Sequence, residues 1–198
     1  MKGTTNMCTR FVYNGKETIV GFNFDIDLSE WEHTVIAEKD RFFLGIKMSD
    51  NKYHSFHGIN RNGNVGTLLY VHGNDNAQFC GNESCYTIAD LTENFIKGNL
   101  SFDDSLEIVK KKKITYAPDT TMQTNPYVLS GDNRYEKAKD LLQGYGENFS
   151  ISNAFDVLRS VRQEGLWATR VSFVYSVTKN KVYYVLNNDF KNIAEYQF

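Results

Sequence analysis

The stretch CTRFVYNGKETIVGFNFD, residues 8–25, decides how the chain begins to fold. Two segments rich in β-branched and aromatic residues, Arg10–Tyr13 and Thr18–Phe24, flank the turn pair Asn14-Gly15. Apolar, strand-forming runs on either side of an Asn-Gly pair are typical of a tight antiparallel hairpin. The sequence therefore predicts a β-hairpin that starts at Cys8.

The segments that follow the hairpin continue as strands. Segments rich in β-branched and aromatic residues predict strands at 33–37, 41–46 and 53–58. A Gly- and Asn-rich turn at 60–64 follows them, and then a short apolar run at 65–71. The first third of the chain is therefore expected to be a β-meander.

The period of the apolar residues changes to a helical one in the middle of the chain. Helices are expected over 87–96, from an N-cap at Ser101 to about Lys113, over 134–142 and over 152–162, before closing strands at 169–177 and 181–186. The basic run Lys110–Lys113 is better explained as a solvated helix end than as a binding patch. Strands, then helices, then strands favour a layered α+β fold over alternating βαβ units, with residues 1–198 as a single domain.

Length and charge exclude several classes of protein. The 198 residues carry 22 Lys and Arg against 24 Asp and Glu, a formal charge of −2. Such a balance gives no general attraction to nucleic acid or to an anionic membrane. No stretch reaches the roughly 18 to 20 apolar residues of a membrane helix, and the N-terminus lacks a signal-peptide apolar region. We expect a soluble cytoplasmic protein with neither nucleic acid nor membrane as partner.

Cysteine and glycine patterns give no support for a cofactor. The chain has three cysteines, and Cys80 and Cys85 are five residues apart without a second ligand pair nearby. A structural zinc site needs about four ligands, so a metal is not expected. No glycine-rich phosphate loop occurs either. We expect no metal and no nucleotide cofactor.

Cys8 is the most informative single residue. A deprotonated cysteine is a competent nucleophile, and a free α-amino group with a pKa of about 7.7 to 8.0 is a natural base at neutral pH. If Cys8 became the first residue, it would carry both groups. The alternative is a small buried thiol in a strand.

Several motifs, in the same order along the chain, resemble those of one hydrolase family. Met7–Phe11 followed by Gly21–Asp25 resembles the start of the choloylglycine hydrolase and penicillin V acylase family, whose mature chain begins with Cys. The later segments Asn60–Tyr70, Ser130–Tyr135 and Thr169–Asn188 resemble its oxyanion-hole strand, its Gly-Asp helix start and its closing strands. The resemblance implies a four-layer αββα sandwich of antiparallel sheets of the N-terminal nucleophile hydrolase type, in a shortened form.

The resemblance also implies roles for five residues. Cys8 would be the nucleophile, Asp25 the carboxylate beside its α-amine, Tyr70 and Asn125 the oxyanion donors, and Arg134 the nearby cation. A donor at the oxyanion typically contributes roughly 3 to 4 kcal/mol to acyl transfer. Three of these residues could instead be purely structural: Asp25 as a turn acid, Tyr70 as a core aromatic residue, and Arg134 as a first-turn helix cation.

The sequence departs from the family pattern at three points. Phe22 stands where the family has an arginine, and Arg10, two residues from Cys8 on the same strand face, is a candidate to compensate. Seven residues precede Cys8, so either a short leader is removed or translation starts at Met7. The passage between Ala117-Pro118 and Thr124-Asn125 is shorter than the family usually has.

The first hypothesis for function is an amidase that cleaves a linear amide of an N-acyl small molecule through a thioester on Cys8. The resemblance suggests conjugated bile salts, penicillin V, N-acyl homoserine lactones or other N-acyl amines as substrates, and homo-oligomers as an assembly. A second hypothesis is a non-catalytic binding relative with an unprocessed N-terminus. A third is a papain-like Cys-His enzyme that uses His54, His57 or His72 as base.

Overall fold

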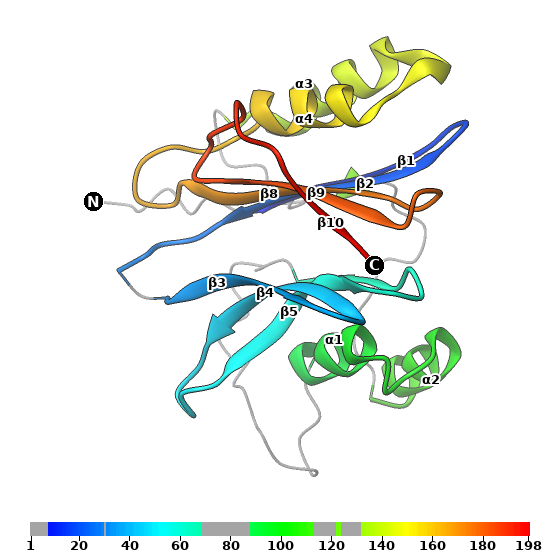
Figure 1. Ribbon diagram of the computed structural model, residues 1–198, viewed down its shortest axis with the longest axis vertical. Helices are drawn as coiled ribbons and strands as arrows, with labels where there is room; N and C mark the ends of the chain where they lie inside the picture. Colours follow the sequence, from blue (N-terminus) through cyan, green and yellow to red (C-terminus); the bar gives the residue numbers. More distant parts are fainter. Residues whose placement is uncertain (1–7, 30, 69–87, 113–121, 124–131) are drawn as a thin grey trace. The chain divides into compact units, whose positions relative to one another are not determined.

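The computed structural model describes residues 8–29, 31–68, 88–112, 122–123 and 132–198 (Figure 1). The chain divides into two compact units. The first is built from residues up to 30 together with 120–197, and the second from 31–119 with the terminal Phe198. That residues 1–198 fold as one domain stays a prediction.

The first unit contains a six-stranded antiparallel sheet in the order β10-β9-β8-β2-β1-β7. Its strands are β1 (Thr9–Asn14), β2 (Thr18–Asp25), β7 (Met122–Gln123), β8 (Thr169–Ser176), β9 (Lys181–Leu186) and β10 (Ala194–Gln197). The predicted hairpin is confirmed: β1 pairs with β2 from Thr9↔Asn23 to Asn14↔Thr18. The first and last thirds of the chain thus share one sheet.

Gly21 shows why the hairpin needs a glycine in the middle of β2. It lies opposite Phe11 on β1, and a Cβ atom at Gly21 would lie 2.3 Å from the Phe11 ring. No real side chain tolerates that distance from a buried ring, and Phe11 is 1% exposed. The glycine therefore lets the aromatic ring fold across the neighbouring strand.

Two helices cover one face of this sheet, α3 (Arg134–Gly144) and α4 (Ile151–Ser160), with a 3₁₀ turn at Gly146–Asn148 between them (Figure 1). A capping box starts α4, in which Ser150 and Asn153 each accept from the other's backbone N–H. Apolar side chains of α4 pack on the sheet in a buried cluster that includes Phe11, Phe155, Leu158 and Val174. This packing fixes the helices against the strands that carry Cys8 and Asp25.

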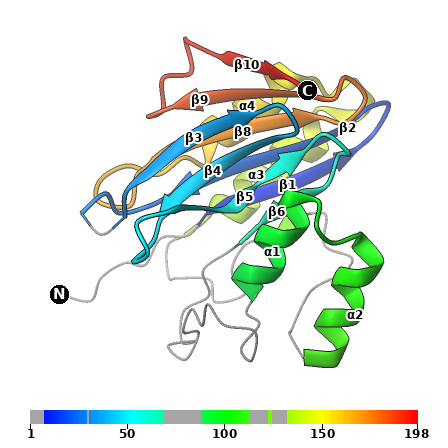
Figure 2. The same cartoon turned by 60° about the horizontal axis from the view of Figure 1, so that its bottom comes forward.

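The second unit contains a four-stranded antiparallel sheet in the order β3-β4-β5-β6. Its strands are β3 (His33–Glu38), β4 (Arg41–Lys47), β5 (Tyr53–Asn60) and β6 (Val65–Thr67), and its helices are α1 (Ile88–Lys97) and α2 (Phe102–Lys112). Helix α1 lies beside β5 and β6 (Figure 2), where a Cβ atom at Gly66 would meet Ile96. The positive φ of Gly98, +76°, ends α1 one residue after Lys97.

Most of the expected elements are present, with three differences. The expected meander is confirmed for β3 to β6, which pair consecutively, but it does not include the first hairpin, because β2 pairs with β1 and β8 in the other sheet. The strand expected over 65–71 ends at Thr67, and residues 69–71 lie outside the described part of the chain. Strands β7 and β10 had no counterpart among the expected strands.

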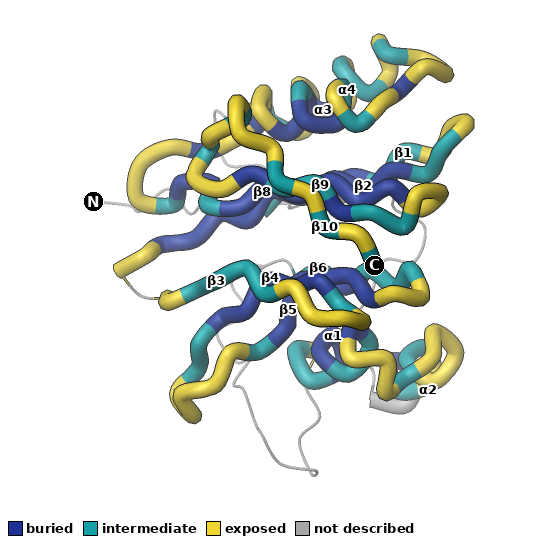
Figure 3. The backbone as a smooth tube through the Cα atoms, viewed as in Figure 1, coloured by how far each residue is buried: buried dark blue, intermediate teal, exposed yellow. Residues whose placement is uncertain are grey.

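Burial is concentrated in the central strands of each sheet (Figure 3). All residues from Ile19 to Asp25 on β2 and from Phe42 to Ile46 on β4 are buried. Successive strand residues point to opposite faces, so both faces of these strands are buried. Among the described residues, no helix is long and apolar enough to cross a membrane.

Candidate active site

The hairpin places Cys8 beside Asp25, 17 residues away in the sequence. Thr9 pairs with Asn23, so the residue before Thr9 lies at the level of the last residues of β2. The backbone N–H of Asp25 donates to Cys8 Sγ over 3.5 Å, and Sγ lies 3.8 Å from the Asp25 carbonyl oxygen. The free, half-buried thiol therefore sits at the open end of the hairpin against the main chain of Asp25.

The Asp25 carboxylate is buried and accepts three hydrogen bonds from described residues. Thr169 Oγ1 donates to Oδ1 over 2.5 Å, Gln163 Nε2 to Oδ2 over 2.6 Å, and Arg134 Nη1 to Oδ2 over 3.4 Å. A register shift in the β2–β8 pairing, between Phe24 and Asp25, brings Asp25 opposite Thr169. The alternative that Asp25 is a turn acid is wrong, because the residue ends a paired strand and its carboxylate is buried.

Arg134 is the first residue of α3, where the helix dipole disfavours a cation. Two carboxylates offset that cost. Asp132 accepts from Arg134 Nε over 3.0 Å and from Nη2 over 2.7 Å, and Asp25 accepts from Nη1. Burial alone would lower the pKa of the Arg134 guanidinium, but Asp132 and Asp25 together hold it above its ordinary value. The structure therefore brings Arg134 to the site as a fixed cation.

The surroundings of Cys8 keep its thiol protonated. Burial raises the pKa of Cys8 to about 12, and the negative charge of Asp25 adds to that rise, while hydrogen bonding from the Asp25 backbone and the charge of Arg134 oppose it. At neutral pH this thiol could therefore act as a nucleophile only if a base took its proton.

Asp25 itself titrates near neutrality. Burial raises the pKa of its carboxyl to about 7, against the hydrogen bonds from Thr169 and Gln163 and the charge of Arg134, which all favour the ionised form. The charge of Asp132 adds to the rise. The site thus holds one carboxyl group whose charge changes near neutral pH.

This raised pKa predicts a pH dependence of stability that belongs to Asp25. The unfolded carboxyl has a pKa of about 3.9, so between about pH 4 and 7 the folded chain holds a proton that the unfolded chain has released. The contribution of Asp25 to the free energy of unfolding is therefore complete below about pH 4. It falls by up to about 1.4 kcal/mol per pH unit and is lost as the pH rises through about 7.

The measurement is urea unfolding at several pH values from 4 to 8, for the protein and for Asp25→Asn. Subtracting the two curves removes the titration of every other group. The difference should fall across this range, and a difference that is flat would contradict the assignment.

Arg10 lies directly across the hairpin from Phe22, where the family pattern has its arginine. Residues two apart on a strand share a face, so Arg10 also shares the face of Cys8. Burial lowers the pKa of Arg10, and its interaction with Cys8 opposes that change. The Arg10 guanidinium on β1 is thus placed to supply the positive charge that Phe22 lacks.

Replacing Arg10 by Ala is expected to slow the alkylation of Cys8 by iodoacetamide at pH 7 by roughly 3- to 10-fold. Loss of a nearby cation raises the thiol pKa, and one pKa unit is a tenfold change in thiolate. Lys16→Ala, at the exposed tip of the same hairpin, is the control and should react as the unchanged protein does. Equal rates for Arg10→Ala across pH would remove Arg10 from the site.

The two expected oxyanion donors, Tyr70 and Asn125, lie outside the described residues. Their roles stay predictions. Of the five residues that the resemblance assigned, Cys8, Asp25 and Arg134 come together in the first unit.

The histidines expected for a papain-like site belong to the second unit or lie outside the described residues. His54 and His57 belong to β5 of the second unit, and His72 is outside the described residues. His54 Nδ1 lies 2.8 Å from Glu93 Oε2, and burial would lower its pKa, but Glu93 and Asp50 hold it above its ordinary value. A histidine held protonated in this way is a poor general base.

Sequence reasoning missed Gln163, Thr169 and the pairing role of Asp132. Thr169 was expected only as the first residue of a strand, and Asp132 only as part of a motif. Nothing in the local sequence around Gln163 points to Asp25, which lies 138 residues away. The described residues include no group of three or more His, Cys, Asp or Glu side chains that could hold a metal.

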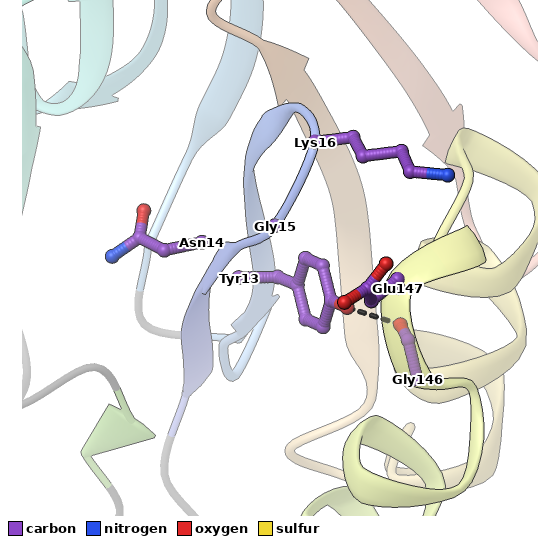
Figure 4. Close-up of a pocket in the computed structure, with 6 residues that line it drawn as sticks. All are labelled: Tyr13, Asn14, Gly15, Lys16, Gly146 and Glu147. Carbon is purple, nitrogen blue, oxygen red and sulfur yellow. Dashed lines mark hydrogen bonds between the residues drawn. The ribbon is translucent and has the colours of Figure 1, made fainter.

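A separate pocket lies at the far end of the hairpin (Figure 4). Tyr13, Asn14, Gly15, Lys16, Gly146 and Glu147 line it, and the Tyr13 hydroxyl donates to the carbonyl oxygen of Gly146. Tyr13 is five strand residues from Cys8, a span of roughly 17 Å. None of its lining residues is a cysteine, and it is not part of the Cys8 site.

The fold and the free cysteine can be compared with known structures. In the described residues, two antiparallel sheets and four α-helices form a mixed α+β structure, with a free cysteine before the first strand. This arrangement resembles the fold of a bile acid hydrolase.

A comparison with solved structures finds a protein of similar fold. The chain is similar to the conjugated bile acid hydrolase from Clostridium perfringens, seen in the crystal structure of a cysteine-to-alanine mutant. The TM-score is 0.57 and the identity 14%, with 96% of this chain and 92% of the other covered. No protein-family model matches the sequence, and no curated protein matches it. The resemblance seen in the sequence motifs is therefore confirmed by the fold.

Proposed function

We propose that the protein is an N-terminal cysteine amidohydrolase that cleaves the linear amide bond of an N-acyl small molecule. The observation that carries the proposal is the position of Cys8. Its thiol lies at the open end of the first hairpin, against Asp25, whose carboxylate is bound by Arg134. The similarity of fold to a conjugated bile acid hydrolase supports the same class of reaction.

The proposed reaction begins when Cys8 is the first residue and its α-amine is free. The amine takes the thiol proton, and the thiolate attacks the carbonyl carbon of the amide. The C–N bond then breaks, and the α-ammonium gives its proton to the leaving amine. Water, deprotonated by the α-amine, attacks the thioester, the acid leaves, and the thiol regains its proton.

Asp25 is suited to hold the α-ammonium in place. A carboxylate offers about four acceptor positions, and the described donors, Thr169, Gln163 and Arg134, take three of them. About one position is left for a further donor, and we assign it to the Cys8 α-amine. An ionised Asp25 would also stabilise the ammonium form that appears during the reaction.

The four-layer αββα order and the oxyanion roles of Tyr70 and Asn125 belong to this proposal. The fold similarity to a bile acid hydrolase, with two antiparallel sheets and four α-helices among the described residues, supports this layer order. The N-acyl amine class of substrate follows from the family resemblance. A small-molecule substrate without metal or nucleotide cofactor is part of the same proposal.

The test is a panel of N-acyl amides given to a chain that begins at Cys8. Glycine and taurine conjugates of bile acids, penicillin V, N-acyl homoserine lactones and simple N-acyl amino acids cover both halves of the substrate. We expect release of free amine from at least one of them, and none from the same chain with Cys8→Ala. If no compound is cleaved, the non-catalytic alternative holds.

A further inference from the structure

Gln163 and Thr169 surround the Asp25 carboxylate in a closed ring of hydrogen bonds. Gln163 Nε2 donates to one carboxylate oxygen and Thr169 Oγ1 to the other. The ring closes because the backbone N–H of Gln163 donates to Thr169 Oγ1 over 2.8 Å. All three residues are buried, with exposed fractions of 5% for Asp25, 7% for Gln163 and 1% for Thr169.

The direction of the bonds in this ring is determined by the chemistry of its members. A backbone N–H is always a donor, so Thr169 Oγ1 accepts from Gln163 and its own proton points at Asp25. The amide nitrogen of Gln163 also donates only. Both groups therefore present protons to the carboxylate, which suits the ionised form.

The main chain of Gln163 is fixed as firmly as its side chain. Its carbonyl oxygen accepts from the backbone N–H of Thr169 over 3.1 Å and from Asn188 Nδ2 over 3.3 Å. The segment between α4 and β8 is thus attached to the start of β8 and to the end of β9. Rotation of the Gln163 amide away from Asp25 would leave a buried carboxylate short of one donor, which costs about 1 to 3 kcal/mol.

We propose that Gln163 and Thr169 are positioning residues of the Cys8 site, which favour the ionised form of the Asp25 carboxylate and fix its orientation. They act through Asp25. The pairing of β2 with β8 brings Thr169 opposite Asp25, and the hydrogen bond from Gln163 to Thr169 holds Gln163 beside them. This inference rests on the proposed function for its meaning in catalysis, but its physical claim concerns Asp25 alone.

The other charged groups that face Asp25 are known from the structure. Arg134 contacts Oδ2, Asp132 lies behind Arg134, and the thiol of Cys8 lies against the Asp25 main chain. None of these groups changes when Gln163 or Thr169 is replaced. A shift in the titration of Asp25 in such variants therefore reports the ring itself.

The experiment is a carbon-13 NMR titration of the aspartate carboxyls in the full chain, with the Asp25 signal identified by its loss in Asp25→Asn. Gln163→Met and Thr169→Val keep nearly the same volume and each remove one donor. Each is expected to raise the titration midpoint of Asp25 by roughly one pH unit, a tenfold change in proton affinity, because a donor to the charged form is lost. Thr169→Ser keeps the hydroxyl and should restore the midpoint.

Matched controls are Gln143→Met and Thr178→Val, the same changes at exposed positions, which should leave the midpoint unchanged. In a chain that begins at Cys8 and hydrolyses its substrate, Gln163→Met and Thr169→Val should also move the acid limb of the pH–rate profile upward by the same amount. An unchanged Asp25 midpoint in both variants would overturn the inference. Because the titration needs no substrate, a lack of hydrolysis would count against the proposed function alone.

Discussion

A chain that begins at Cys8 is expected to hydrolyse its N-acyl substrate at least about 10⁴-fold faster than the same chain with residues 1–7 attached. An internal Cys8 has an amide nitrogen, which cannot take a proton, in place of an amine. With a thiol pKa of about 12, the thiolate fraction at pH 7 is on the order of 10⁻⁵. A neighbouring α-amine titrating near 8 supplies a base beside the thiol, whereas the contacts of Cys8 Sγ with Asp25 are to its main chain.

The measurement compares initial rates of amine release for the two chains, after intact mass has verified both N-termini. The chain that begins at Cys8 is made by cleavage directly before that residue. Its Cys8→Ala variant measures the rate without a nucleophile, and loss of a nucleophile commonly costs 10⁴-fold or more. Equal rates with and without residues 1–7 would show that the α-amine of Cys8 is not the base.

Replacing Asp25 by Ala should destabilise the protein by about 3 to 5 kcal/mol. The change leaves a buried hydroxyl on Thr169, a buried amide on Gln163 and one side of the Arg134 guanidinium without their acceptor. For a chain of this size that loss corresponds to a fall of the melting temperature of roughly 6 to 20 °C.

Thermal unfolding followed by circular dichroism checks this result. Asp156→Ala on α4 is the matched control: its carboxylate is 42% exposed and only pairs with Arg159 over 3.7 Å, so the expected change is below about 1 kcal/mol. Asp25→Asn should fall between the two, because it keeps the shape of the side chain and one acceptor oxygen. A melting temperature for Asp25→Ala equal to that of Asp156→Ala would contradict the three buried hydrogen bonds.

The local parts of the site could be predicted from the sequence. The strand pattern on both sides of Asn14-Gly15 gave the hairpin, and the family resemblance placed Asp25 beside Cys8. Strand alternation also put Arg10 on the face of Cys8. The predictions of the hairpin and of Arg10 succeed because each depends on a few neighbouring residues and a fixed strand period.

The distant parts could not be predicted from local physics. Arg134 reaches Asp25 across 109 residues, and it was expected only because a motif resembled one in a known family. Gln163 and Thr169 reach Asp25 across 138 and 144 residues, through the β2–β8 pairing and its register shift. Neither the pairing of β2 with β8 in place of β3 nor a one-residue shift leaves a pattern in the local sequence.

The most direct test of the central claim is to alkylate Cys8 in the chain that begins with it and to follow activity at the same time. Peptide mass spectrometry measures the fraction of Cys8, Cys80 and Cys85 that carries a carbamidomethyl group as iodoacetamide is added. The proposed function predicts that hydrolysis falls in proportion to the labelling of Cys8, and that substrate slows this labelling. Hydrolysis that persists when Cys8 is fully labelled would contradict the claim that Cys8 is the nucleophile.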